Sequence, residues 1–156
     1  HEAQLPLVYN HKPTGRGDDY NNLSGQPLFP FGYGLSYTSF AYGVSTLDRK
    51  EIAANEATVL RCTLTNTGSR DGEEVVQLYI RDVLATVARP VLELKGFQRV
   101  ALKAGESKEV IFNITPELLR MLNGQLQWVT EPGKFELLVG ASSRDIRIKE
   151  ELMVSK

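Results

Sequence analysis

The chain has 156 residues, of which 42% are hydrophobic, and both values are typical of one globular domain with a sizeable core. Eighteen basic and nineteen acidic residues leave a net charge of −1, which argues against nucleic acid or an anionic membrane as a partner. No apolar run approaches the roughly 20 residues that a membrane-spanning helix requires.

The first 36 residues differ in composition from the rest of the chain. After a short extended run at 5–9, residues 10–34 are rich in Gly, Pro, Asn, Asp and aromatic residues, without helical or strand periodicity. A structureless stretch of about 25 residues is unusual inside a compact domain. We therefore expect a linker, or a segment that wraps over another part of the protein. The start at His1, with no initiator Met and no apolar leader, predicts a mature or excised piece.

From Tyr37 onward, short hydrophobic runs alternate with turn signals. Alternating residues predict strands near 40–44, 59–65, 74–81, 91–102, 110–114, 125–129, 135–139 and 146–148. In the first of these, Phe40, Tyr42 and Val44 alternate with smaller or polar residues. A period of two with a turn every 8–12 residues or so is typical of an antiparallel sandwich or barrel. The predicted fold is all-β, an immunoglobulin-like sandwich of about seven strands.

Two of these runs have a clear hydrophobic face. In the run 59–65, Leu60, Cys62 and Leu64 share one face, so the single cysteine is expected to be a small core residue rather than a reactive thiol. The run 74–81 divides its side chains between two faces, with Val76, Leu78 and Ile80 on one and Val75, Gln77, Tyr79 and Arg81 on the other.

One segment, 115–124, departs from the strand pattern. Thr115 is a typical N-cap residue, Pro116 suits the first helical position, and Asn123-Gly124 is a stop signal. The segment predicts one short helix or turn that crosses between the sheets.

Several stretches resemble glycoside hydrolase family 3. PLFPFGYGLSYTSF (27–40) looks like the junction that precedes the C-terminal domain of that family. RPVLELKGFQRV (89–100) is similar to a recurring segment of the family's fibronectin type III-like domain, and LKAGES (102–107) and VIF (110–112) continue the likeness. LVYNHKPTGR (7–16) resembles the closing strand and exit loop of the preceding α/β sandwich domain. The resemblance therefore implies two parts, a domain tail plus connector at 1–36 and a fibronectin type III-like sandwich at 37–156.

The connector has a composition that suits a single fixed path. Prolines and closely spaced glycines make it stiff and bent, and aromatic side chains give it apolar mass. Such a segment left exposed would be an unusual apolar patch. We expect it to pack against its own sandwich or against a neighbouring domain.

The resemblance also implies where catalysis takes place. Family 3 enzymes of the β-glucosidase or β-xylosidase type use two carboxyl groups in a retaining mechanism. The resemblance puts the nucleophilic Asp in an N-terminal barrel and the acid/base Glu in the α/β domain, so no residue here inherits a catalytic role. The adjacent pairs Asp18-Asp19 and Glu73-Glu74 are expected to be solvated charges.

We therefore expect a non-catalytic accessory domain that buttresses the barrel and the α/β sandwich domains of the same parent chain. We expect no catalytic, cofactor-binding or metal-binding residue in this chain, and no cofactor. Whether the protein forms a homodimer is left open.

Three short motifs suggest other functions. Arg16-Gly17-Asp18 spells a cell-adhesion tripeptide, although three residues recur by chance and these fall in what resembles the family's exit loop. An adhesion or surface spacer domain stays an alternative. The segment 32–34, Gly-Tyr-Gly, lacks the third glycine and the strand-to-helix context of a nucleotide loop. His1 and His11 lie apart, without Cys or clustered carboxylates, which argues against a metal site.

The aromatic residues leave a further alternative, a carbohydrate-binding module. Trp128, Tyr79 or Tyr33 could form a sugar platform. We favour packing instead, with Trp128 near a sheet edge and the tyrosines sealing the connector or a domain interface. Asn22 and Asn113 fit the glycosylation pattern, which has meaning only in a eukaryotic secretory pathway.

Overall fold

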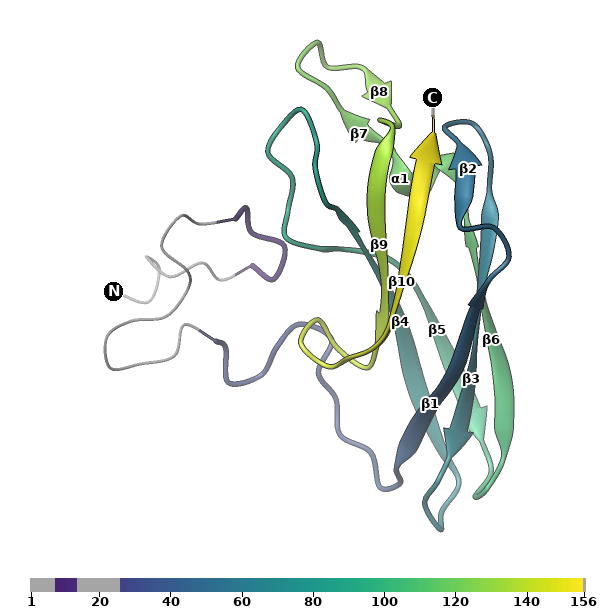
Figure 1. Cartoon of the computed structure of the whole chain (residues 1–156). Coiled ribbons are helices and arrows are strands. Elements are labelled where there is room, and N and C mark those ends of the chain that lie inside the picture. The colour runs from purple at the N-terminus through teal and green to yellow at the C-terminus, as the bar shows by residue number, and fades with distance from the viewer. Residues whose placement is uncertain (1–7, 14–25, 156) are drawn as a thin grey trace, which may run out of the picture.

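The computed structural model describes residues 8–13 and 26–155, and the strands of this part form two facing sheets and one small hairpin (Figure 1). In chain order the elements are β1 (Phe40–Leu47), β2 (Glu51–Ala53), β3 (Thr58–Asn66), β4 (Gly72–Asp82), β5 (Glu93–Leu102), β6 (Ser107–Ile114), α1 (Pro116–Leu119), β7 (Met121–Leu122), β8 (Trp128–Val129), β9 (Gly133–Gly140) and β10 (Ile146–Ser155). One sheet has the order β1–β3–β6, the other has the order β2–β10–β9–β4–β5, and β7 pairs with β8.

The two large sheets form an antiparallel sandwich. All their strand pairs are antiparallel except that of β2 with β10. The strands of eight residues or more are β1, β3, β4, β5, β6, β9 and β10. The predicted immunoglobulin-like sandwich of about seven strands with one short helix is confirmed. That helix has four residues, and no helix in the described ranges has the length and apolar character to cross a bilayer.

The core lies between the two sheets, where the hydrophobic faces predicted from the sequence meet. Leu60, Cys62 and Leu64 of β3 are buried in the same cluster as Val76 and Leu78 of β4. Each fully buried aliphatic side chain stabilises such a core by about 1.5–3 kcal/mol. Burial raises the pKa of the Cys62 thiol to about 11, and nearby Glu109 adds to the effect. Cys62 is therefore a core residue, as predicted, and its burial keeps the thiol protonated near neutral pH.

The edge strand β1 departs from the predicted alternation. Phe40 and Tyr42 pack against the core, but the register with β3 shifts between Tyr42 and Ser45, and Val44 lies exposed. The shift behaves as a β-bulge, which moves the inward face from even to odd positions. The apolar type of Val44 alone could not reveal this shift. A second irregularity lies between Leu78 and Tyr79, where β4 pairs with the edge strand β5.

The predicted short helix forms only in the first part of the segment 115–124. Helix α1 ends at Leu119, and the chain then enters the hairpin β7–β8 (Figure 1). Asn123-Gly124 belongs to the hairpin turn, where the Asn123 side chain accepts hydrogen bonds from the backbone N–H groups of Gln125 and Gln127. Asn-Gly is a hairpin signal as well as a helix stop, and here the hairpin forms. The strand predicted at 125–129 shortens accordingly to β8.

Candidate functional site

The outer face of the five-stranded sheet, which points away from β1, β3 and β6, carries two N-terminal segments. From here on, the name connector covers all the described residues before β1 that lie on this face, namely 8–13, which the sequence resemblance assigns to the domain tail, and 26–37. On this face of β4 lie Gln77 and Tyr79, and both are buried. The centre of β4 is therefore covered on both sides, by the core on one and by the connector on the other (Figure 1).

All the side-chain polar atoms of Gln77 are paired, and one of its hydrogen bonds joins the connector to the sheet. Its amide nitrogen donates to the carbonyl of Gly32 at 3.0 Å and to the carbonyl of Ala141 at 2.7 Å. Its amide oxygen accepts a hydrogen bond from the Tyr79 hydroxyl at 2.5 Å. Burial raises the pKa of Tyr79 to about 12, with a further contribution from Tyr9, so this hydroxyl remains a donor. A buried amide with every group paired stabilises one path of the connector.

Gly32 is required where the connector passes over Gln77. Its φ is +81°, a left-handed conformation that glycine adopts without strain. A Cβ at Gly32 would lie 2.1 Å from Oε1 of Gln77. Both the backbone angle and the close approach therefore exclude a side chain, which explains one of the glycines in the sequence of the connector.

Aromatic stacking adds a second attachment. Tyr9 stacks on Phe31 with ring centroids 4.0 Å apart, and it meets Tyr79 edge-on at 6.0 Å. The Tyr9 hydroxyl accepts a hydrogen bond from the backbone N–H of Leu94 at 3.1 Å. Aromatic pairs of this kind contribute about 0.5–1.5 kcal/mol beyond their burial.

Backbone hydrogen bonds tie the connector to the loops around the sheet. Ser143 donates to the carbonyl of Phe31, and Val91 donates to the carbonyl of His11, both at 2.9 Å. Together with the Gln77 and Tyr9 contacts, they support the expectation that the connector packs against its own sandwich.

Other connector side chains are left uncovered within the described part of the chain. Leu28, Leu35 and Tyr37 are 87%, 88% and 93% exposed, and Phe29 and Tyr33 pack mainly on each other. On the sheet itself, Phe97 of β5 is exposed directly across from Gln77. Exposed apolar side chains of this size are candidates for contact with another surface.

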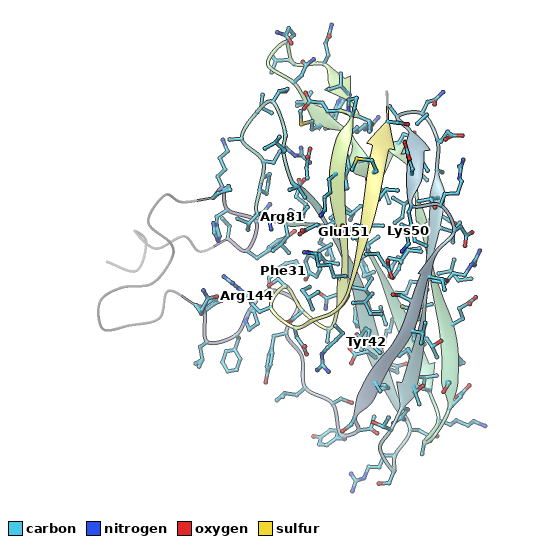
Figure 2. The ribbon with its side chains drawn as sticks, viewed as in Figure 1. Phe31, Tyr42, Lys50, Arg81, Arg144 and Glu151 are labelled. Atoms are coloured by element: carbon cyan, nitrogen blue, oxygen red, sulfur yellow. The ribbon has the colours of Figure 1, made fainter. Side chains whose placement is uncertain are left out.

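A cleft of about 280 Å³ lies between the connector and β4 and β9. Its lining residues are Tyr9, His11, Arg81, Val91, Leu92, Glu136, Leu138, Ser143 and Arg144. Figure 2 shows Phe31, Arg81 and Arg144 beside one another on this side of the sheet. Within the cleft, the buried Glu136 carboxylate lies 2.7 Å from Nζ of Lys149 and 3.5 Å from Nη1 of Arg81.

A second cluster of titratable groups lies at the end of the sandwich near the 141–145 turn. Burial raises the pKa of Glu74, and Asp145 adds to this, while the Val75 N–H and Arg147 act in the opposite direction. The Tyr42 pKa is also raised, first by burial and then by Glu74, and its buried hydroxyl has no hydrogen-bond partner in the described part. Glu74 was predicted to be a solvated charge. It is half-buried because even-numbered residues of β4 point inward.

The sugar platform suggested by the aromatic residues does not assemble. Tyr79 is buried beneath the connector and Tyr33 belongs to the connector, whereas Trp128 is 60% exposed on the β7–β8 hairpin. The guanidinium of Arg120 lies 4.8 Å from the centre of the Trp128 ring. Trp128 alone of the three candidates presents a free aromatic surface away from the connector.

Other candidates fall outside the described residues or stay separate. His1, Asp18-Asp19, Asn22 and the tripeptide 16–18 lie outside the described ranges. Asn113 is exposed on β6, and Glu73 is exposed and pairs with Arg99. The described residues contain no group of three or more His, Cys, Asp or Glu arranged to hold a metal ion. The cleft and the connector contacts form between segments that lie far apart in the sequence. Local hydrophobic periodicity therefore could not predict them.

Comparisons with known proteins agree with this architecture. The sequence profile of the fibronectin type III-like domain matches residues 74–143. A β-xylosidase of Formosa agariphila is 48% identical over 146 residues, covering 91% of this chain and 20% of the relative. A crystal structure of a Listeria innocua β-glucosidase in complex with glucose superposes with a TM-score of 0.91 at 39% identity, covering 99% of this chain and 23% of that chain.

One of the matching crystal structures is described as a member of the family GH3. The crystal structure of a Bifidobacterium adolescentis GH3 β-glucosidase matches with a TM-score of 0.76 at 37% identity, covering 88% of this chain and 20% of that chain. The chain thus spans about a fifth of the length of the proteins it matches. It is a C-terminal fibronectin type III-like domain of the glycoside hydrolase family 3 type.

Proposed function

We propose that this chain is a non-catalytic accessory domain of a β-glucosidase- or β-xylosidase-type glycoside hydrolase, and that it buttresses the catalytic domains of the same parent chain. The observation that carries the proposal is the connector, which is anchored on the sheet by Gln77 and Tyr9 but leaves Leu28, Leu35 and Tyr37 uncovered. Residues of this type stabilise an interface when a second surface covers them.

The proposal assigns roles to the two parts of the chain. Residues 1–36 are the tail of a preceding α/β sandwich domain plus the connector, and residues 37–156 are the sandwich. The start of β1 at Phe40 supports a boundary near residue 37. The partners are the barrel and the α/β sandwich domain of the parent chain, and the two catalytic carboxyl groups reside there. A homodimer stays a prediction, which sedimentation of the parent enzyme tests.

Two experiments test the accessory role. We expect the purified 156-residue chain to leave aryl β-glucosides and β-xylosides uncleaved. We expect the parent enzyme without residues 37–156 to lose thermal stability or solubility, because its docking surface becomes exposed. If the truncated parent is as stable and active as the intact one, the buttress role is wrong. Turnover by the 156-residue chain would contradict the non-catalytic assignment.

The exposure of the Trp128 ring supports carbohydrate binding as a second candidate function. Its exposed ring is backed by the Arg120 guanidinium on a short hairpin, and aromatic faces of this kind stack on sugars. Because Trp128 is the only tryptophan, its fluorescence reports directly on this position. Saturable quenching by gluco- or xylo-oligosaccharides would support a binding module, and a flat titration would remove it.

The adhesion alternative rests on the tripeptide alone. Cell attachment that is lost in Asp18→Glu would support it, and attachment that is absent or unchanged would remove it.

A further inference from the structure

We infer that the cleft between the connector and strands β4 and β9 receives an Asp or Glu side chain from a neighbouring domain of the parent enzyme. The inference rests on the proposed function, because it names the chemistry of one contact in that interface. It assigns Arg144 and Arg81 as the residues that bind the incoming carboxylate.

The cleft contains more positive than negative side-chain charge. Glu136 supplies one buried carboxylate, and it already has a close partner in Lys149 at 2.7 Å. Arg81 contacts Glu136 only at 3.5 Å, so most of its donors remain available. Arg144 is exposed, and within the described part of the chain its guanidinium forms no hydrogen bond or ion pair. With Glu136 paired to Lys149, the remaining charge in the cleft is positive, from Arg81 and Arg144, and it complements an anion.

The position of Arg144 is fixed by its turn. The hydroxyl of Ser142 accepts hydrogen bonds from the backbone N–H groups of Arg144 at 3.4 Å and Asp145 at 3.0 Å. The neighbouring Ser143 is held by the carbonyl of Phe31. A guanidinium on an ordered turn loses less freedom on binding than one on a mobile loop. Its planar donors match the two oxygens of a carboxylate.

The shape of the cleft favours a side chain over an extended ligand. Tyr9, Leu92 and Leu138 provide apolar walls, and the volume of about 280 Å³ suits one side chain and its immediate neighbours. Apolar walls surround the methylene groups of an Asp or Glu, while the arginines meet its carboxylate. The connector itself forms one side of the cleft through Tyr9 and His11, and the proposed function places the neighbouring domain against the connector.

The test compares Arg144→Ala with Arg70→Ala in the parent enzyme and in the 156-residue chain. Arg70 is a matched control, because it is also exposed on a turn without a side-chain partner in the described ranges, and it does not line the cleft. The measurement is the rate of limited proteolysis of the connector, at low and at high salt.

We expect Arg144→Ala to accelerate cleavage in the parent on the order of tenfold, because an interdomain ion pair is lost. In the 156-residue chain the same variant should change the rate by less than about twofold, since the carboxylate comes from elsewhere. Arg70→Ala should have no effect in either protein. High salt should reduce the difference in the parent, because it screens the ion pair.

Equal cleavage rates for Arg144→Ala and Arg70→Ala in the parent would overturn the inference. So would saturable binding of glucuronate to the 156-residue chain that Arg144→Ala abolishes, because the carboxylate would then belong to a free ligand. Either of these two results can be distinguished from a result that contradicts the proposed function. If deletion of residues 37–156 destabilises the parent while Arg144→Ala does not, the buttress role stands and only the assignment of the cleft is wrong.

Discussion

The side-chain amide of Gln77 donates a hydrogen bond to the backbone carbonyl of Gly32, across 45 positions of sequence and a distance of 3.0 Å. This contact places the connector on the outer face of the larger sheet, over strand β4. It also explains why β4 is buried on both faces, since Gln77 and its neighbour Tyr79 would otherwise face solvent. The connector is thus part of the folded domain wherever Gln77 and Tyr9 anchor it.

Removal of the Gln77 amide should destabilise the domain. Gln77→Leu leaves the carbonyls of Gly32 and Ala141 without their donor and the Tyr79 hydroxyl without its acceptor. We expect a loss of about 2–4 kcal/mol in the free energy of unfolding, since each unpaired buried group costs about 1–3 kcal/mol. Urea unfolding measures the change. Gln125→Ala is the control, because its side chain is exposed on the hairpin, and a comparable loss there would contradict the role of Gln77.

Gly32→Ala and Gly34→Ala form a matched pair within the connector. At Gly32 the added Cβ meets Gln77 at 2.1 Å and φ is +81°, whereas at Gly34 nothing lies within 4 Å. We expect Gly32→Ala to cost about 1–3 kcal/mol and to speed proteolysis of the connector. Gly34→Ala should leave both measurements nearly unchanged. If both variants behave alike, the connector does not follow the path described.

Glu74 should make the domain less stable as pH rises. Burial raises its pKa in the folded state, so the folded protein holds this proton more tightly than the unfolded chain. The resulting stability is complete below the unfolded pKa of about 4.3 and is lost as pH rises through the folded pKa. Glu74→Gln should therefore increase the melting temperature at pH 7 more than at pH 4.

The neighbouring Glu73→Gln is the control for that pH dependence. Glu73 is exposed and pairs with Arg99 at the surface, so its loss should lower stability slightly, by about 0–1 kcal/mol. A stabilisation of equal size in both variants would show that net charge, rather than the burial of Glu74, causes the effect.

Two tyrosines predict opposite responses to the loss of a hydroxyl. The Tyr42 hydroxyl is buried without a partner in the described part, so Tyr42→Phe should be neutral or stabilising. The Tyr79 hydroxyl donates to Gln77, so Tyr79→Phe should cost about 1 kcal/mol. Thermal unfolding of the two variants measures the difference. A larger loss for Tyr42→Phe would mean that its hydroxyl has a partner after all.

The sequence predicted those features that depend on local periodicity. Leu60, Cys62 and Leu64 occupy every second position of their strand, and all three lie in the core because a strand with one buried face has that spacing. Val44 has the same spacing from Tyr42, but a bulge turns it outward, and bulges depend on pairing with another strand. The burial of Gln77 depends on a segment 45 residues earlier, so its residue type gave no indication of it.

The irregular edges of the sandwich limit how the domain can associate with other chains. Both the bulge in β1 and the register shift beside β5 occur where an edge strand joins its sheet. An irregular edge presents its backbone N–H and C=O groups out of step, which makes it a poor template for an added strand. We therefore expect fibril formation by strand addition to be suppressed at these edges. Neighbouring domains should instead attach through side chains on the faces and loops.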